Sequence, residues 1–438
     1  MTTTTGLPSG VAVSVLPLVS RRRARLWPQP PPPAHPLVHL TVATVVAILV
    51  SATAASRGIG GELQVVADFE GGSAKVESLD QEKRLVRIVP TPHADRGWRC
   101  WWYFKLVGVS PEETITLDVG EAPWATPDRA AYSLDGRNWQ QTDPGKREGK
   151  RIVYQQKIDA AEVWFAWGPP FVPSDAAALC KQAAQRCRFA QHFQLCRSRE
   201  GRPTPALRIF EPENGRAARY GVVVVARQHA WESGSSWVCR GLIEWLISQQ
   251  PQAAALRKQA EMVVVPLMDV DNAAIGAGGK EQKPHDHNRD WTEQPYFPAV
   301  EAVQKIIRQM DSAGRLDLFI DLHNPAANDP TFFFVTPRNL LSDIGQRNLE
   351  RFVAAAMAEI TGPLPLSQKT RESGPGYDRR WQAISKNWVT QNTQKHVVAV
   401  TLETAWNTPH STIDGYLTVG RQLGKAIHRY LRDDPRQR

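Results

Sequence analysis

The sequence predicts a small all-β sandwich domain followed by an α/β domain whose mixed, largely parallel sheet is flanked by helices. Three observations predict this fold class. The 438 residues exceed the length of one ordinary domain. Short runs of branched and aromatic residues fill residues 61–171, and beyond them long apolar runs alternate with amphipathic stretches. We therefore expect a signal peptide or N-terminal anchor at 1–56, a β-sandwich domain at 57–170, and the α/β domain at 171–438.

The first segment has the composition of an export signal. Residues 1–56 contain no acidic residue, and four arginines at positions 21, 22, 23 and 25 precede an apolar stretch at 37–50 and small residues at 51–56. A basic flank, a short apolar core and a small-residue exit are typical of a secretory signal peptide, with an uncleaved N-terminal anchor as the alternative. We expect an exported protein, periplasmic or extracellular, with no membrane contact beyond such an anchor.

Charge and cysteine content exclude two classes of function. The formal net charge of +9 falls to about +5 without the four arginines of the first segment, and no long basic run remains, which disfavours nucleic-acid binding. The five cysteines show no C-x-x-C spacing, so they predict neither a thiolate zinc site nor a full disulfide framework. One disulfide among Cys180, Cys187 and Cys196 and entirely free thiols remain alternatives.

The β segment contains five predicted strands and many tryptophans. The strands are expected at 62–70, 84–90, 99–109, 114–120 and 151–158, where β-branched and aromatic residues are frequent. Large aromatic side chains in a small sandwich are most often core, and a carbohydrate-stacking surface is the alternative. This choice concerns Trp98, Trp101, Trp102, Trp124, Trp139, Trp164 and Trp167.

The α/β segment begins after Gly168-Pro169-Pro170. Continuous apolar runs, as expected for strands buried on both faces, occur at 220–226, 262–267, 316–322 and 397–402. Helical periodicity predicts helices at 236–249, 299–310, 345–360 and 413–431.

Three of these apolar runs lead directly into metal-binding residue types. His229 and Glu232 follow the first run, His323 follows the third, and Glu403 follows the fourth. Because ligands of open α/β sheets bind at the carboxyl ends of the strands, these side chains are expected to converge. Two imidazoles and one carboxylate form a three-ligand zinc set that leaves a position for water, which predicts one Zn²⁺ per chain. Glu403 is then free to act as the general base toward that water.

Four motifs resemble those of the zinc carboxypeptidase superfamily, in particular its cytosolic-carboxypeptidase-like branch, which carries a β domain before the catalytic one. The resemblance extends over residues 61–431. It rests on Arg227-Gln228-His229-Ala230-Trp231-Glu232-Ser233, on Asp286-His287-Asn288-Arg289-Asp290-Trp291, on Asp321-Leu322-His323, and on Thr401-Leu402-Glu403.

The resemblance implies a role for each site residue. His229, Glu232 and His323 would hold zinc, Glu403 would be the general base, and Asn288 and Arg289 would bind the substrate carboxylate. A guanidinium suits that task because it grips a carboxylate with two parallel hydrogen bonds. The alternative for Asn288 and Arg289 is a loop ion pair with a neighbouring aspartate.

Two further residues of the family's active site have no exact match in this sequence. The family places an oxyanion-stabilising arginine about nine residues before the N-R pair, and this chain has Gly276-Ala277-Gly278-Gly279-Lys280 there. Lys280 is therefore the candidate for that charge, with Arg227 as the second candidate and a solvated loop lysine as the alternative. Tyr377, in a glycine-rich segment, is the candidate for a tyrosine that closes over substrate.

Other site chemistries are weaker. The sequence has no G-x-S-x-G element, which disfavours a serine hydrolase. His285 and His287 flank Asp286 and form a competing metal motif, but the strand-end set already completes a zinc site. Asp321 is expected to orient a ligand rather than to bind the metal.

These observations predict a zinc metallocarboxypeptidase that hydrolyses C-terminal peptide bonds, with a peptide or protein C-terminus as its substrate. One alternative keeps the metal but changes the bond, giving a desuccinylase-like or cell-wall zinc amidohydrolase. The other is a tryptophan-rich binding module with a weak catalytic domain.

Overall fold

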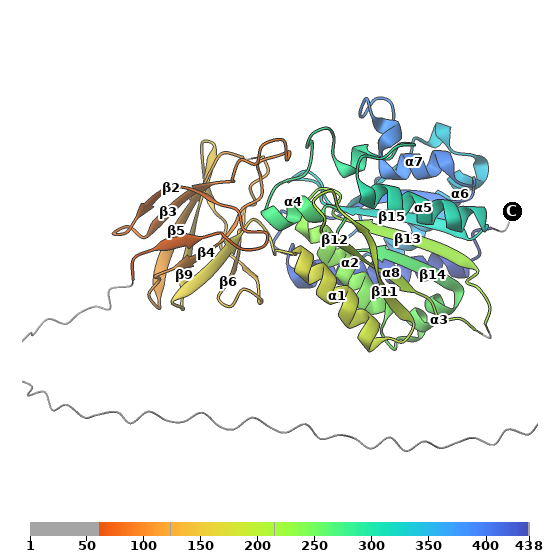
Figure 1. Cartoon of the computed structure of the whole chain (residues 1–438), viewed down its shortest axis with the longest axis horizontal. Coiled ribbons are helices and arrows are strands. Elements are labelled where there is room, and N and C mark those ends of the chain that lie inside the picture. The colour runs from red at the N-terminus through yellow and green to blue at the C-terminus, as the bar shows by residue number, and fades with distance from the viewer. Residues whose placement is uncertain (1–60, 123, 214, 437–438) are drawn as a thin grey trace, which may run out of the picture. The chain divides into compact units, whose positions relative to one another are not determined.

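The computed structural model describes residues 61–122, 124–213 and 215–436. The predicted signal peptide or anchor at 1–56 lies outside the described residues. Figure 1 shows the strands of the N-terminal β region (residues 61–171) in red-orange to yellow, and the sheet and helices of the α/β region (residues 172–436) in yellow, through green, to blue. All described residues lie within one compact unit.

The β region consists of two five-stranded sheets. The first has the order β1-β4-β10-β6-β7 and the second the order β2-β3-β5-β9-β8. The first contains β1 (Gln64–Val66), β4 (Tyr103–Val107), β10 (Glu162–Ala166), β6 (Ala131–Ser133) and β7 (Gln140–Gln141). The second contains β2 (Lys75–Asp80), β3 (Leu85–Val89), β5 (Glu113–Val119), β9 (Arg151–Ile158) and β8 (Lys146–Glu148).

One hydrophobic core joins the two sheets of the β region, which confirms the predicted sandwich. Phe104 and Phe165 of the first sheet and Ile88, Leu117 and Tyr154 of the second are almost completely buried in this core. Alternate residues of β3 and β4 are buried in this core, as expected for pleated strands of a sandwich.

The α/β region is built on one eight-stranded mixed sheet, with the order β11-β12-β14-β13-β15-β18-β16-β17. The four central strands β14, β13, β15 and β18 run parallel, and β12 and β16 pair with them in the antiparallel sense. The strands are β11 (Ala190–Arg197), β12 (Pro203–Ile209), β13 (Tyr220–Ala226), β14 (Ala260–Val265), β15 (Leu316–His323), β16 (Phe332–Val335), β17 (Arg371–Glu372) and β18 (Val398–Glu403).

Helices cover both faces of this sheet. Residues of α1 (Pro173–Arg186), α2 (Ser233–Leu246), α3 (Pro251–Gln259), α6 (Asp343–Glu359) and α8 (Ile413–Arg432) share one core with one face. Residues of α5 (Pro298–Ser312) and α7 (Ser385–Asn392) share a second core with the other face. The short helix α4 (Val270–Ile275) follows β14. Every residue of the four central strands is buried, which explains their continuous apolar sequences.

The four predicted α/β strands are confirmed, but element boundaries and edge strands differ from the predictions. The helix expected at 236–249 begins at Ser233 and ends at Leu246. The next helix, α3, begins at Pro251, and Gln250 directly before this proline is extended, as the proline ring requires. The edge strand β11 gave no sequence signal because many of its side chains are exposed and polar.

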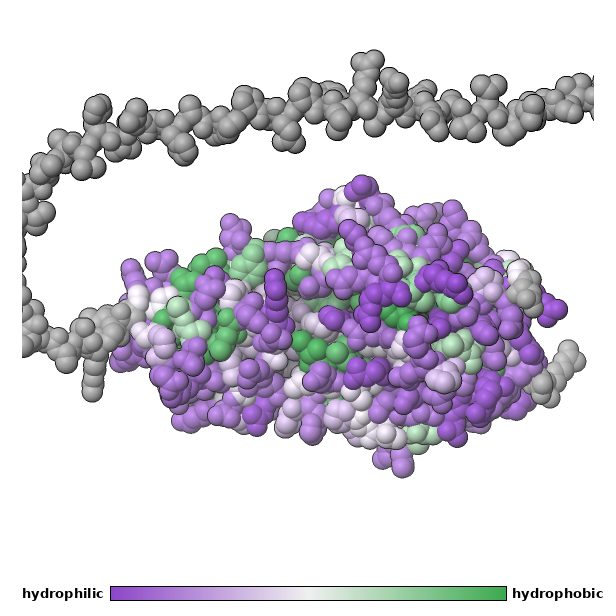
Figure 2. All heavy atoms as spheres, turned by 90° about the horizontal axis from the view of Figure 1, so that it is seen from below, coloured by the Kyte–Doolittle hydropathy of each residue, from purple (hydrophilic) through white to green (hydrophobic). Residues whose placement is uncertain are grey.

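None of the helices in the described part of the chain combines the length and apolar character that a membrane span needs. On the face that Figure 2 shows, hydrophobic residues form small separate patches among hydrophilic ones. The five cysteines are all free thiols, and four of them are buried.

Candidate metal centre and active site

Three strand ends bring the predicted metal ligands together. In the parallel register, Ala226 at the end of β13 pairs with Leu322 of β15, and His323 at the end of β15 pairs with Glu403 at the end of β18. His229 lies three residues beyond β13, in the turn that leads into α2. The site therefore lies at the carboxyl edge of the sheet, as the sequence predicts.

The three candidate ligands converge on one point. The Nδ1 atoms of His229 and His323 each lie 2.7 Å from a different oxygen of the Glu232 carboxylate. One ligand atom from each residue lies within 4.8 Å of the others, and all three side chains are buried. Among the described residues this is the one such cluster of histidine, cysteine and carboxylate groups.

Each histidine also has a carboxylate near its other ring nitrogen. Nε2 of His229 lies 3.5 Å from Asp286 Oδ1, and Nε2 of His323 lies 3.0 Å from Asp321 Oδ2. A carboxylate at the far nitrogen fixes the ring orientation and makes the ligating nitrogen more basic. The predicted orienting role of Asp321 agrees with this geometry, while Asp286 is a partner that the sequence did not single out.

Asp321 is itself held by hydrogen bonds. Its Oδ2 accepts from Gln228 Nε2 at 2.6 Å and from Ser385 Oγ at 2.5 Å. The Gln228 amide oxygen in turn accepts from Trp291 Nε1 at 2.8 Å. These buried contacts connect the turn after β13, the strand β15 and the start of α7, so the position of His323 is fixed from three elements.

The carboxylates of Glu232, Asp286 and Asp321, which surround the two imidazoles, suit a cation. Burial by itself lowers the pKa of His323, but the carboxylates of Asp321 and Glu232 raise it well above its ordinary value. Burial would raise the pKa of Glu232, but His229 and His323 hold it below its ordinary range. The carboxylate is therefore ionised, and both Nδ1 atoms point toward it. Two imidazoles and one carboxylate of this geometry fit a single Zn²⁺ with an open position.

Glu403 lies beside this cluster but is not one of the three candidate ligands. The side chain is 9% exposed, and its Oε2 has no hydrogen-bond partner among the described residues. Burial raises its pKa to about 7, with His323 opposing the shift. A carboxylate of this kind is able to exchange a proton near neutral pH.

Asn288 and Arg289 lie behind the metal cluster in a short 3-10 helix, His287–Arg289. The Asn288 amide nitrogen is 3.3 Å from His323 Nε2, and its oxygen accepts from the Ser385 backbone at 3.0 Å. Arg289 Nε donates to Asp378 Oδ2 at 2.9 Å. Arg289 therefore does form an ion pair, but with Asp378 rather than with its sequence neighbours.

The two other predicted residues, Lys280 and Tyr377, line the same cavity as Glu403 and His229. Lys280 Nζ lies 5.1 Å from the centre of the Trp98 ring. Tyr377 is 50% exposed, and the centre of its ring lies 5.2 Å from that of the Phe334 ring.

Arg227, the second candidate for the oxyanion charge, is placed differently. Its side chain is buried and donates to the backbone oxygens of Ala230 and Phe171, at 2.6 and 3.0 Å. Burial lowers its pKa to about 9. The guanidinium shapes the turn that carries His229, whereas Lys280 faces the cavity.

The β region holds the lysine loop in place. The Trp98 backbone nitrogen donates to the Lys280 oxygen, Gly279 donates to the Arg96 oxygen, and Lys283 donates to the Asp95 oxygen, all at 2.9 Å. We call these three hydrogen bonds the backbone clasp between residues 95–98 and 279–283. Lys280 therefore occupies a segment that is paired on one side with the β region.

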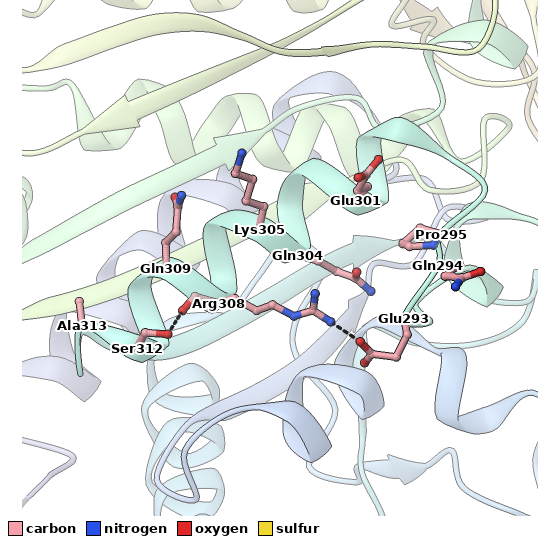
Figure 3. Close-up of a pocket in the computed structure, with 10 residues that line it drawn as sticks. All are labelled: Glu293, Gln294, Pro295, Glu301, Gln304, Lys305, Arg308, Gln309, Ser312 and Ala313. Atoms are coloured by element: carbon pink, nitrogen blue, oxygen red, sulfur yellow. Dashed lines mark hydrogen bonds and ion pairs between the residues drawn. The ribbon is translucent and has the colours of Figure 1, made fainter.

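The cavity at the metal cluster has a volume of about 420 Å³, within the usual range for small-ligand sites. It is lined by residues of both regions, including Trp98 and Trp124 from the β region and Trp231, Phe332 and Trp406 from the α/β region. A larger hollow along α5, shown in Figure 3, is unrelated to the metal cluster. Most of the residues that line it are polar or charged by type, and they include the exposed ion pair between Arg308 and Glu293 at 2.9 Å.

The histidines of the competing metal motif have other partners. His285 Nε2 lies 2.5 Å from Asp290 Oδ1, and the His287 ring stacks on Phe297 at 3.8 Å. Asp286 points to His229 instead. The motif therefore supports the first metal site and does not build a second one among the described residues.

The sequence reasoning missed the aromatic lining of the cavity. Trp101, Trp102 and Trp167 are buried core residues, as expected, but Trp98 and Trp124 face the metal cavity. Nothing in the local pattern separates these two groups, because both lie in short segments between strands.

Comparison with known proteins agrees with this geometry. The family model described as zinc carboxypeptidase matches residues 177–405, more than half of the chain, and that described as the cytosolic carboxypeptidase N-terminal domain matches residues 65–167. The fold is similar to a metallo-carboxypeptidase of Burkholderia cenocepacia, with a TM-score of 0.74 and 21% identity over 85% of this chain and 99% of that one. A Pseudomonas aeruginosa metallo-carboxypeptidase gives a TM-score of 0.71 and 23% identity over 85% and 100%.

Matches to curated proteins cover smaller shares of both chains. An uncharacterized protein of Zymomonas mobilis is 26% identical over 60% of this chain and 68% of its own length. Cytosolic carboxypeptidase 6 of Homo sapiens is 33% identical, but the match covers 30% of this chain and 27% of the human protein. Cytosolic carboxypeptidase 2 of Danio rerio is 23% identical over 53% and 37%. Taken with the zinc-ligand geometry and the family models, these findings show that the chain belongs to the zinc carboxypeptidase family and carries a cytosolic-carboxypeptidase-type N-terminal domain.

Proposed function

We propose that this protein is a zinc-dependent metallocarboxypeptidase that hydrolyses the C-terminal peptide bond of peptides or proteins, with Glu403 as the general base. The observation that carries the proposal is the pairing of His323 with Glu403 across β15 and β18. Glu403, whose Oε2 has no hydrogen-bond partner among the described residues, thus lies beside three converging candidate zinc ligands and lines the same cavity.

The roles of the chain's own residues follow from their positions. When bound, zinc supplies a Lewis acid that polarises the scissile carbonyl and lowers the pKa of water. Glu403 accepts the proton of the attacking water on its carboxylate and then delivers it to the leaving nitrogen. Lys280, which faces the cavity, stabilises negative charge on the carbonyl oxygen in the transition state.

Asn288 and Arg289 bind the terminal carboxylate of the substrate, and Tyr377 covers it. Arg289 is available for this task if the substrate carboxylate replaces or joins Asp378, whose side chain is 28% exposed. Tyr377 adjoins Asp378 in sequence and is half exposed, so its ring is free to move toward the bound residue.

The test uses zinc-loaded protein and a mixed peptide library, sampled by mass spectrometry with and without a chelator. Loss of single C-terminal residues that stops on chelation and returns with zinc supports the proposal. The matched control is the same library with C-terminal amides, which removes the charge that Arg289 would bind. Equal cleavage of both libraries, or no cleavage by protein with one bound zinc, contradicts it.

A second candidate is a zinc amidohydrolase acting on N-acyl amino acids. It is favoured by the engagement of Arg289 with Asp378 and by a lysine where the family has an arginine. Turnover of N-succinyl or cell-wall-type amides, without release of residues from peptides, would identify this activity.

We also propose export, on the basis of the basic and apolar segment at 1–56. N-terminal sequencing of protein recovered from the medium or periplasm tests it. A protein that stays in the cytoplasm with these residues intact contradicts it.

A further inference from the structure

Four indole rings border the cavity at the metal cluster. Trp98 and Trp124 come from the β region, Trp231 lies between the ligands His229 and Glu232 in sequence, and Trp406 follows β18. The ring centres of Trp98 and Trp124 are 4.6 Å apart at 80°, those of Trp98 and Trp231 are 6.2 Å apart, and those of Trp231 and Trp406 are 5.9 Å apart. We call these four residues the tryptophan wall.

The exposure of this wall is uneven. Trp231 and Trp406 are 3% and 5% exposed and belong to the core of the β region, whereas Trp124 is 53% exposed. Among the described residues, the two most exposed large hydrophobic side chains are Trp124 and Tyr377, and both line this cavity. A large aromatic group kept exposed beside a cavity is expected of a binding surface, because it adds little to folding stability.

The proposed function fixes which part of the substrate meets the wall. The terminal residue is directed toward Asn288, Arg289 and Tyr377. Tyr377 packs on Phe334, and no ring contact joins it to the tryptophan wall among the described residues. Glu403 and His229 line the same cavity, and Nζ of Lys280, the residue proposed to face the carbonyl oxygen, lies 5.1 Å from the centre of the Trp98 ring, so the wall adjoins the place proposed for the scissile bond. The wall is then next to the residue that precedes the scissile bond.

The wall offers mainly apolar surface, and the polar atoms on it are few: the Trp231 indole nitrogen, which has no hydrogen-bond partner among the described residues, and the Lys280 ammonium over the Trp98 ring. Ala125 and the small residues 325–327 line it further, and both polar atoms of the Asn324 amide are already bonded to the backbone of Ser235 and Thr404. Asp329 is held by two hydrogen bonds from Arg371. A sugar needs several polar partners around a stacking ring, whereas an aromatic or aliphatic side chain needs the ring alone. The wall therefore suits an apolar side chain.

We propose that the tryptophan wall is a specificity subsite for the residue immediately before the scissile bond, and that it selects a large apolar or aromatic side chain there. This inference rests on the proposed carboxypeptidase function. Trp124 supplies the exposed ring against which that side chain packs, and the edge contact with Trp98 holds the ring in place.

The test compares peptides that share one C-terminal residue and carry Phe, Leu, Ala or Gly before it. For zinc-loaded protein we expect kcat/KM to be about tenfold higher with Phe than with Ala, the size expected for one aromatic packing contact. Trp124→Ala is expected to bring this ratio close to one. Trp139→Ala is the matched control, since Trp139 belongs to the same region and packs on Tyr103 outside the cavity. It is expected to keep the ratio.

Binding provides a second measurement that does not depend on turnover. Calorimetric titration of zinc-loaded Glu403→Gln with the same peptides is expected to give a Kd about tenfold lower for Phe than for Ala. Equal values for the two peptides, or an equal loss of preference in Trp124→Ala and Trp139→Ala, overturn the inference. Tighter binding of an oligosaccharide than of the Phe peptide also overturns it. A Phe preference in binding without cleavage of any peptide refutes the proposed function and leaves the subsite standing.

Discussion

At the residue scale, the proposed chemistry depends on one carboxylate with an unusual environment. Glu403 is buried beside Glu232, and burial raises its pKa to about 7. A bound cation favours the ionised form, so the pKa in the zinc-loaded protein lies at or below that value. The side chain is thus at least half ionised at pH 7 and more fully ionised above it, in the pH range where it would act as the proposed general base.

We expect kcat/KM to fall as the pH decreases through this pKa, because the protonated carboxyl cannot accept a proton. The acid limb has a slope of one and a midpoint at or below pH 7. Glu403→Gln is expected to lower kcat by about 10²- to 10⁴-fold, to remove that limb and to keep one zinc per chain. Rates across pH and metal analysis check this, and a variant with unchanged activity shows that another group is the base.

A second prediction concerns Asp321. Because its Oδ2 lies 3.0 Å from His323 Nε2, Asp321→Asn removes the charge that orients and strengthens this ligand. Zinc affinity is expected to weaken by about 10- to 100-fold, measured by competition with a chelator of known affinity. Asp343→Asn, an exposed change at the start of α6, is the control. Equal affinities in the two variants contradict the orienting role.

At the element scale, the lysine loop depends on its clasp with the β region. A Cβ at Gly278 would lie 2.0 Å from the Trp98 backbone oxygen, so this approach requires glycine. The loop also supports the zinc turn, because the Trp231 backbone nitrogen donates to the Gly278 oxygen at 3.0 Å. A change at this glycine therefore reaches both Lys280 and the metal ligands.

Gly278→Ala is expected to destabilise the protein by about 1–3 kcal/mol, since backbone atoms must move to admit the methyl group. It is also expected to reduce kcat more than it changes zinc content, because it displaces Lys280. Thermal unfolding and steady-state kinetics measure the two effects. In the control Gly168→Ala, the nearest atom is Ser233 Oγ at 3.5 Å, an ordinary contact, so little change is expected. Gly278→Ala with control-like stability contradicts the tight approach.

At the scale of the whole molecule, the two regions share one hydrophobic core. Trp231, from the zinc turn, and Trp406, from the segment after β18, pack with Trp167 and other core residues of the β region. The candidate ligands His229 and Glu232 flank Trp231 in sequence, so we expect metal binding to stabilise the contact between the regions as well as the ligands.

Removal of zinc is expected to lower the melting temperature of the whole described unit. A metal that binds only the folded state contributes about 2.7 kcal/mol when it is present at 100 times its Kd. Differential scanning calorimetry with a chelator, and then with zinc restored, measures the shift. His323→Ala is the control, because it lacks a ligand and is expected to melt at the same temperature with and without zinc. A shift of equal size in that variant assigns the effect to zinc bound elsewhere.

The amino-acid sequence by itself determined the fold class, the four buried parallel strands and the metal ligands. Continuous apolar runs specify strands buried on both faces, and each ligand follows such a run directly, so its place in space follows from its place in the chain. Glu403 and Asp321 were predictable for the same reason. Edge strands such as β11 were not, because their exposed polar side chains carry no periodic signal.

Only the tertiary structure decided which distant segments meet at the site. The pairing of Asp286 with His229, the clasp between residues 95–98 and 279–283, and the tryptophan wall all join parts of the chain that no local pattern connects. Trp98 and Trp102 are four residues apart in the same segment between β3 and β4. Trp98 nevertheless lines the cavity, whereas Trp102 is completely buried. Their difference arises from how the two regions pack against each other. Such packing depends on contacts between residues far apart in the sequence, so the residues next to each tryptophan do not predict it.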